Sequence, residues 1–143
     1  MSTELTYTAV PSSYLHCMSS HCPQANTCLR AIAWSLVPTE QIRIEVVNPS
    51  VITEAAGCPY YRDAAPVRYA LGFKSMQAKM VPAQYDRFMM FLQSKFGRNP
   101  YFERRKGERA MPPKEQAIVR QSLAYASVPT DWEFDAYKMD YLW

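Results

Sequence analysis

The chain has 143 residues, of which 48% are hydrophobic and 20% are charged, and it carries a net charge of +3. This apolar fraction excludes an intrinsically disordered chain, and the length suffices for one domain with a hydrophobic core. With four glycines beside eleven prolines, the chain has little material for glycine-rich phosphate-binding loops. A mean hydropathy of -0.30 and the absence of a long apolar run exclude a membrane span.

The first third of the chain predicts irregular structure, then one helix and one short strand. Residues 1–21 show no sustained periodicity. Apolar residues at helical spacing between 22 and 37 predict a helix that Pro38 closes. Apolar and charged residues alternate over 42–46, which predicts a half-buried strand.

The middle of the chain predicts one strand and two helices. Residues 67–73 alternate as a second strand would. Pro82 begins a helix whose apolar stripe runs to residue 96, and Gly97 suits the position that follows it. The pair Pro112–Pro113 begins another helix, which extends to about residue 126.

The segment between these helices, residues 98–111, is basic and lacks helical periodicity. Lys106 and Gly107 predict the turn of a small hairpin between Phe102–Arg105 and Glu108–Met111. The acidic, aromatic segment that ends the chain is expected to dock on the body of the protein.

The expected fold class is α+β: a single compact domain over 1–143, mostly helical, with a small sheet and an irregular N-terminal third. Three parts differ in charge: a cysteine-containing part (1–66, net −2), a basic helical part (67–128, net +8) and the acidic aromatic tail (129–143, net −3). The basic part could bind phosphate or pair with the tail.

The strongest candidate site is a group of cysteines. All four lie within the first 58 residues: Cys17, Cys22, Cys28 and Cys58. Four thiolates satisfy the tetrahedron that zinc prefers, and they also suit an iron–sulfur cluster. The spacing is diagnostic of neither, so ordinary buried thiols without metal, and disulfides, stay open as alternatives. His16 and His21, each directly before a cysteine, are spare ligands.

Helix geometry sets a condition for this metal site. In a helix that began at Pro23, Cys22 and Cys28 would be separated by about 240° and about 9 Å, and could not share one ion. A metal site therefore requires a loop over residues 22–26, with Cys28 in the first turn of the helix.

The second candidate is a basic surface for nucleic acid. Its members combine cations with an aromatic ring: Arg98, Tyr101, Arg104, Arg105, Lys106 and Arg109. Cations neutralise phosphates, and an exposed ring such as Tyr101 can stack on a base. The alternatives are a solvated loop whose arginines pair with nearby carboxylates, and a surface for an acidic protein partner.

Several enzyme classes lack their motifs. The sequence contains no dinucleotide-binding, P-loop, serine-hydrolase or zinc-protease motif. A thiol or redox enzyme, for example with Cys58 beside His16 or His21, is the less favoured alternative. We therefore expect a non-catalytic, regulatory protein with a metal site and a basic face, or else a protein-interaction module with buried cysteines. No signal peptide is visible at the N-terminus, so the expected location is the cytoplasm, where thiols stay reduced.

Several runs resemble a family of small bacterial proteins classified as a domain of unknown function. They are HCPQANTCLR (21–30), VNP (47–49), CPYYR (58–62), FGRNPYF (96–102) and RKGER (105–109). The resemblance spans about residue 14 to the end of the chain. It implies a bacterial cytosolic protein and supplies no activity, cofactor or catalytic residue.

Overall fold

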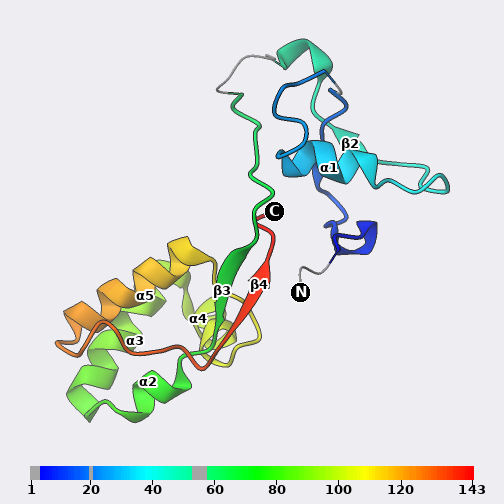
Figure 1. The fold of residues 1–143 in the computed structure, drawn as a ribbon. Helices are drawn as coiled ribbons and strands as arrows, with labels where there is room; N and C mark the ends of the chain where they lie inside the picture. Colours follow the sequence, from blue (N-terminus) through cyan, green and yellow to red (C-terminus); the bar gives the residue numbers. More distant parts are fainter. Residues whose placement is uncertain (1–3, 20, 53–57) are drawn as a thin grey trace. The chain divides into compact units, whose positions relative to one another are not determined.

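The structure is a computed structural model that describes residues 4–19, 21–52 and 58–143. It divides the chain into two compact units: unit 1 comprises residues 1–65 and 141–143, and unit 2 comprises 66–140. Helices combine with two small two-stranded sheets, so the α+β class expected from the sequence is confirmed (Figure 1).

Unit 1 is built from short elements joined by irregular chain. In order they are the 3-10 turn η1 (Tyr7–Ala9), β1 (Leu15–His16), α1 (Leu29–Ser35), β2 (Glu45–Val46) and the 3-10 turn η2 (Pro49–Val51). β1 pairs with β2 in parallel, with Leu15 opposite Glu45 and His16 opposite Val46. The strand expected over 42–46 thus forms only at its last two residues.

A small aromatic core holds unit 1 together. Tyr14, Leu29 and Ala33 are buried there. The ring of Trp143 packs edge-on against Tyr14, with ring centroids 5.0 Å apart. Residues at the C-terminal end of the sequence thereby contribute to the packing of the segment that contains the cysteines.

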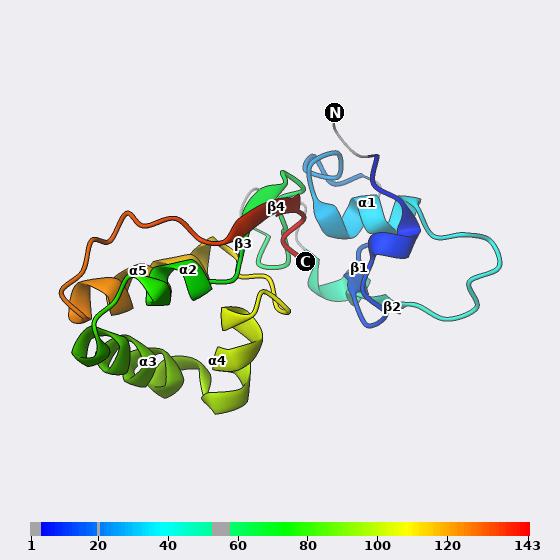
Figure 2. The same cartoon turned by 90° about the horizontal axis from the view of Figure 1, so that it is seen from below.

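Unit 2 contains the longer helices and a two-stranded antiparallel sheet. Its elements are β3 (Val67–Leu71), α2 (Lys74–Ala78), α3 (Pro82–Phe96), α4 (Arg98–Arg105), α5 (Pro113–Tyr125) and β4 (Ala136–Asp140). β3 and β4 lie side by side in both views, and their register runs from Val67 opposite Asp140 to Leu71 opposite Ala136 (Figures 1 and 2). α3 packs against both α4 and α5.

The core of unit 2 lies between these helices and the strands. Its largest fully buried side chains are aromatic or aliphatic: Phe73, Met76, Phe88, Leu92, Tyr101, Met111, Val119 and Leu123. Phe73 contacts both Phe88 and Tyr101, with ring centroids 5.5 and 5.7 Å apart. Large rings therefore account for much of the apolar area buried in this unit.

α3 and α5 form where the sequence predicts them, because their end signals are strong. Proline occupies the first turn of each helix, where a missing N–H costs no hydrogen bond. Gly97 ends α3 with φ +89° and ψ 166°, a conformation open almost only to glycine.

The hairpin expected over 102–111 is wrong. Residues 98–105 form α4, and the chain then turns at Gly107 and makes a single bridge between Met111 and Ala70. The helical period was missed because one of the two inward-facing positions, Tyr101 and Arg104, is an arginine. Pro100 is compatible with this helix because it lies in the first turn.

Asp135 fixes the start of α2 from a distant part of the chain. Its carboxylate accepts hydrogen bonds from the backbone N–H groups of Lys74 and Ser75, both at 2.9 Å. Partial burial works to raise the pKa of Asp135, but the hydrogen bonds from Ser75 and Lys74 outweigh it and hold that pKa below its usual value. A Cβ at Gly72 would lie 2.7 Å from this carboxylate, so this approach requires glycine.

No helix in the described part of the chain combines the length and apolar character needed to cross a bilayer.

Candidate metal centre

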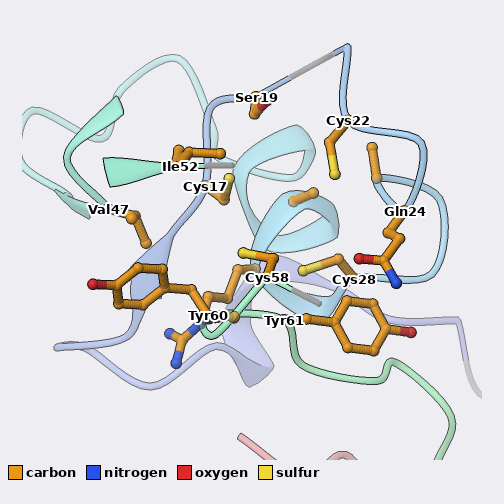
Figure 3. Close-up of a pocket in the computed structure, with 13 residues that line it drawn as sticks. Cys17, Ser19, Cys22, Gln24, Cys28, Val47, Ile52, Cys58, Tyr60 and Tyr61 are labelled. Atoms are coloured by element: carbon orange, nitrogen blue, oxygen red, sulfur yellow. Dashed lines mark hydrogen bonds between the residues drawn. The ribbon is translucent and has the colours of Figure 1, made fainter. Parts of the chain in front are cut away.

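All four cysteines line one cavity in unit 1. Its volume is about 20 Å³, which is room for about one water-sized sphere. Figure 3 shows the four sulfur atoms around this space, delivered by different segments of the chain. Each of the four is a free thiol rather than half of a disulfide. The structure thus brings together the whole cysteine set predicted from the sequence.

The loop condition set by helix geometry is met. α1 begins only at Leu29, and Cys28 is its N-cap residue with extended φ and ψ of -90° and 120°. Residues 22–27 form turns, closed by hydrogen bonds from Ala25 N to the Cys22 oxygen (3.1 Å) and from Cys28 N to the Gln24 oxygen (2.9 Å). Because the chain folds back here, Cys22 and Cys28 reach the same cavity.

The other two cysteines arrive on separate segments. Cys17 follows β1 directly, and its N–H donates to the Arg30 carbonyl at 3.1 Å. Cys58 begins a turn in which Tyr61 N donates to the Cys58 oxygen at 3.2 Å. The backbone of this segment is joined to α1 by a bond from Leu29 N to the Arg62 oxygen at 2.6 Å.

Arg30 lines the same cavity, although it is not a metal-ligand residue type and belongs to no ligand motif in the sequence. Its Nε donates to the Tyr60 carbonyl at 2.7 Å, and its Nη1 donates to the Leu15 carbonyl at 2.9 Å. The guanidinium also lies 5.1 Å from the centroid of the Tyr14 ring. Its position in the sequence, two residues after Cys28, is a feature that could have indicated this role.

The two histidines are not part of this cavity. His16 is buried, donates from Nδ1 to the Glu45 carbonyl at 3.0 Å and has the Tyr7 hydroxyl 3.1 Å from Nε2. Both ring nitrogens therefore have partners, which leaves neither available as a metal ligand. His21 is exposed and does not line the cavity.

The four thiols surround the cavity, but their sulfur atoms are not positioned to coordinate one ion. Within residues 4–19, 21–52 and 58–143, no group of three or more Cys, His, Asp or Glu side chains is arranged to hold a metal ion. Zinc–sulfur bonds are about 2.3 Å long, so coordination requires the sulfur atoms to move inward. Cys17, Cys22 and Cys58 are only partly buried and lie on turns or strand ends, where small shifts disturb little packing.

A larger cavity adjoins the first. It has a volume of about 280 Å³, and Cys17, Ser19, Ala25 and Ala31 line both. Small side chains therefore make up most of the wall between the two cavities.

The basic residues proposed for nucleic acid do not form one surface. Tyr101 is 0% exposed, and its hydroxyl accepts a hydrogen bond from Gln77 Nε2 at 2.6 Å. Burial raises the pKa of Tyr101, and the Gln77 hydrogen bond offsets part of that effect. Arg104 is 5% exposed and forms an ion pair with Glu115. Neither side chain can reach a nucleic acid from these positions.

The remaining four cations differ in their surroundings. Arg105 is half-buried, and its Nε donates to Gln77. Arg98 and Lys106 are exposed at opposite ends of α4. Arg109 is exposed and lies 3.6 Å from the Glu103 carboxylate. Three exposed cations thus remain from the six residues first considered.

Comparison with known proteins identifies the family without indicating an activity. No curated protein matches the chain, and no solved structure matches it. A family model described as "Family of unknown function (DUF6078)" matches residues 1–143. The cysteine segments and α4 both fall within that match, and the chain therefore belongs to the DUF6078 family.

Proposed function

We propose that this protein binds one zinc ion through Cys17, Cys22, Cys28 and Cys58, in a non-catalytic site that stabilises unit 1. The observation that carries the proposal is the convergence of all four thiols on one small cavity. The four cysteines lie on separate turns and strand ends of a unit that has only a small hydrophobic core. A bound metal would cross-link these segments and so stabilise the unit.

The donor set fits a structural zinc ion. Zinc prefers four thiolates in a tetrahedron and leaves no open position in structural sites. Four thiolates also suit an iron–sulfur cluster, and the metal analysis below distinguishes the two. This donor set therefore supports a structural role rather than catalysis.

The test measures the metal content of the full-length protein purified in the presence of zinc. We expect one zinc per chain, and we expect cobalt in its place to give the thiolate charge-transfer absorption of a four-sulfur site. Cys28→Ser should abolish tight binding, because one thiolate is lost from the tetrahedron.

His21→Ala is the matched control, since His21 adjoins Cys22 but does not line the cavity. It should bind zinc as the wild type does. A brown protein that contains iron and sulfide would show that the site holds an iron–sulfur cluster instead of zinc. Retention of full zinc affinity in Cys28→Ser would overturn the four-cysteine site.

A second candidate function is binding of nucleic acid by unit 2. The observation that favours it is charge: residues 66–140 hold 13 Lys and Arg against 8 Asp and Glu. Because Tyr101 is buried, it cannot stack on a base. The proposed contacts are therefore those of Arg98, Lys106 and Arg109 with phosphates. Such binding would be independent of base sequence and sensitive to salt.

A further inference from the structure

We infer that Arg30 is the positioning residue of the four-cysteine site, because its hydrogen bonds hold three of the cysteine segments together. This inference rests on the proposed zinc site. Arg30 is not itself a metal ligand, and it forms hydrogen bonds with the chain on either side of the cavity.

The hydrogen bonds of Arg30 connect separate cysteine segments. The Leu15 carbonyl, which accepts from Nη1, lies two residues before Cys17. The Tyr60 carbonyl, which accepts from Nε, lies two residues after Cys58. Arg30 itself lies two residues after Cys28, so one side chain joins the segments of three of the four thiols.

The backbone of Arg30 adds a third connection. Its carbonyl accepts the N–H of Cys17 at 3.1 Å. The guanidinium is also held from a further direction by the ring of Tyr14, which is 7% exposed. A planar donor fixed by two carbonyls and a ring keeps its place whether or not metal is bound, so the arrangement is present before the ion arrives.

The choice of variant separates the hydrogen-bond geometry of Arg30 from its charge. Arg30→Lys retains the charge but cannot donate to two carbonyls in fixed directions. Arg30→Gln removes the charge and retains one donor group. Arg62→Gln is the matched control, because Arg62 is an exposed arginine on the Cys58 segment that does not line the cavity.

The experiment measures zinc affinity by chelator competition, and the thiolate absorption spectrum of the cobalt-substituted protein, in the full-length variants. We expect Arg30→Gln and Arg30→Lys each to lower zinc affinity about 10- to 100-fold. Both should also change the cobalt spectrum, because the cysteine segments are no longer held in the same positions. Arg62→Gln should change neither the affinity nor the spectrum.

The outcomes distinguish this inference from the proposed function. If the wild type binds no zinc, both fall. If the wild type binds zinc and Arg30→Lys matches it in affinity and cobalt spectrum, only the role of Arg30 is overturned. An equal loss of affinity in Arg62→Gln would show a general effect of removing an arginine and would also overturn it. Should Arg30→Gln fail to fold, a wild-type affinity in Arg30→Lys would refute the positioning role.

Discussion

Two arginines in this protein act from the inside of the fold. Arg30 reaches the carbonyls of Leu15 and Tyr60 in unit 1. Arg104 in unit 2 donates to Glu115 and to the Pro100 carbonyl, and its guanidinium lies 4.2 Å from the centroid of the Phe96 ring. Because guanidinium is planar and weakly hydrated, it suits such sites better than an ammonium group.

The Arg104–Glu115 pair should be essential to the stability of unit 2. The two side chains are only 6% and 19% exposed, so truncating Arg104 leaves a carboxylate shielded from water without its partner. We expect Arg104→Ala to lower the free energy of unfolding by about 3–5 kcal/mol, measured by urea denaturation at neutral pH.

The control for this prediction is Arg98→Ala at the exposed start of α4. It should change the free energy of unfolding by less than about 0.5 kcal/mol. Equal and small effects of both substitutions would show that the buried pair contributes nothing.

At the residue scale, the sequence indicates the candidate ligands better than the residues that support them. The cysteines stand out by type, and their convergence follows once residues 22–27 are recognised as a loop. The sequence does not indicate that Arg30 and Arg104 have partners within the fold, because charged residues usually lie on solvated surfaces. Distant partners identify them: the Tyr60 carbonyl lies 30 residues from Arg30, and Glu115 lies 11 residues from Arg104.

Among the elements, the corner between α3 and α4 shows how local chemistry directs the chain. A single residue, Gly97, separates the two helices, with φ +89° and ψ 166°. The same residue accepts the N–H of Tyr101 at 3.0 Å, which helps start α4. This corner is what turns Tyr101 and Arg104 toward the core.

We expect Gly97→Ala to lower the free energy of unfolding by about 1–3 kcal/mol, since the conformation is strained for any residue with a Cβ. The cost would come from the backbone alone, because the added Cβ would lie 3.7 Å from Pro100 Cδ, an ordinary contact. Urea denaturation provides the measurement.

Ser94→Ala, an exposed position in the last turns of α3, is the comparison and should have little effect. A neutral Gly97→Ala would show that the corner relaxes to another conformation.

Elements were predictable where their ends are marked in the sequence. α3 has proline at its start, an apolar stripe and glycine at its end, and it forms over the predicted residues. β4 has no such marks: Ala136, Lys138 and Met139 are exposed. It is a strand because β3 lies beside it, a pairing between residues about 70 positions apart that no local pattern specifies.

For the whole molecule, the uneven charge is its most evident property. Unit 1 has a net charge of −2 and unit 2 a net charge of +5. Lysines and arginines therefore outnumber carboxylates only in the unit without cysteines. This charge is the basis of the proposal that unit 2 binds nucleic acid.

If unit 2 binds nucleic acid, affinity for single- and double-stranded oligonucleotides should fall linearly on a log–log plot against salt concentration. Combined Arg98→Gln and Lys106→Gln substitutions should reduce both the affinity and this slope, measured by fluorescence anisotropy. They should leave zinc content unchanged. Binding that is insensitive to salt and to both substitutions would exclude the proposal.

The pairing of β3 with β4 also determines how the chain passes between the units. It enters unit 2 before Val67 and leaves it after Asp140, and these two residues are opposite each other in the sheet. Unit 2 is thus an insertion within unit 1. The ring of Trp143, which packs on Tyr14, therefore reaches unit 1 only after the chain has passed through the whole of unit 2. Complete packing of the cysteine-containing unit thus depends on residues from both sides of the insertion.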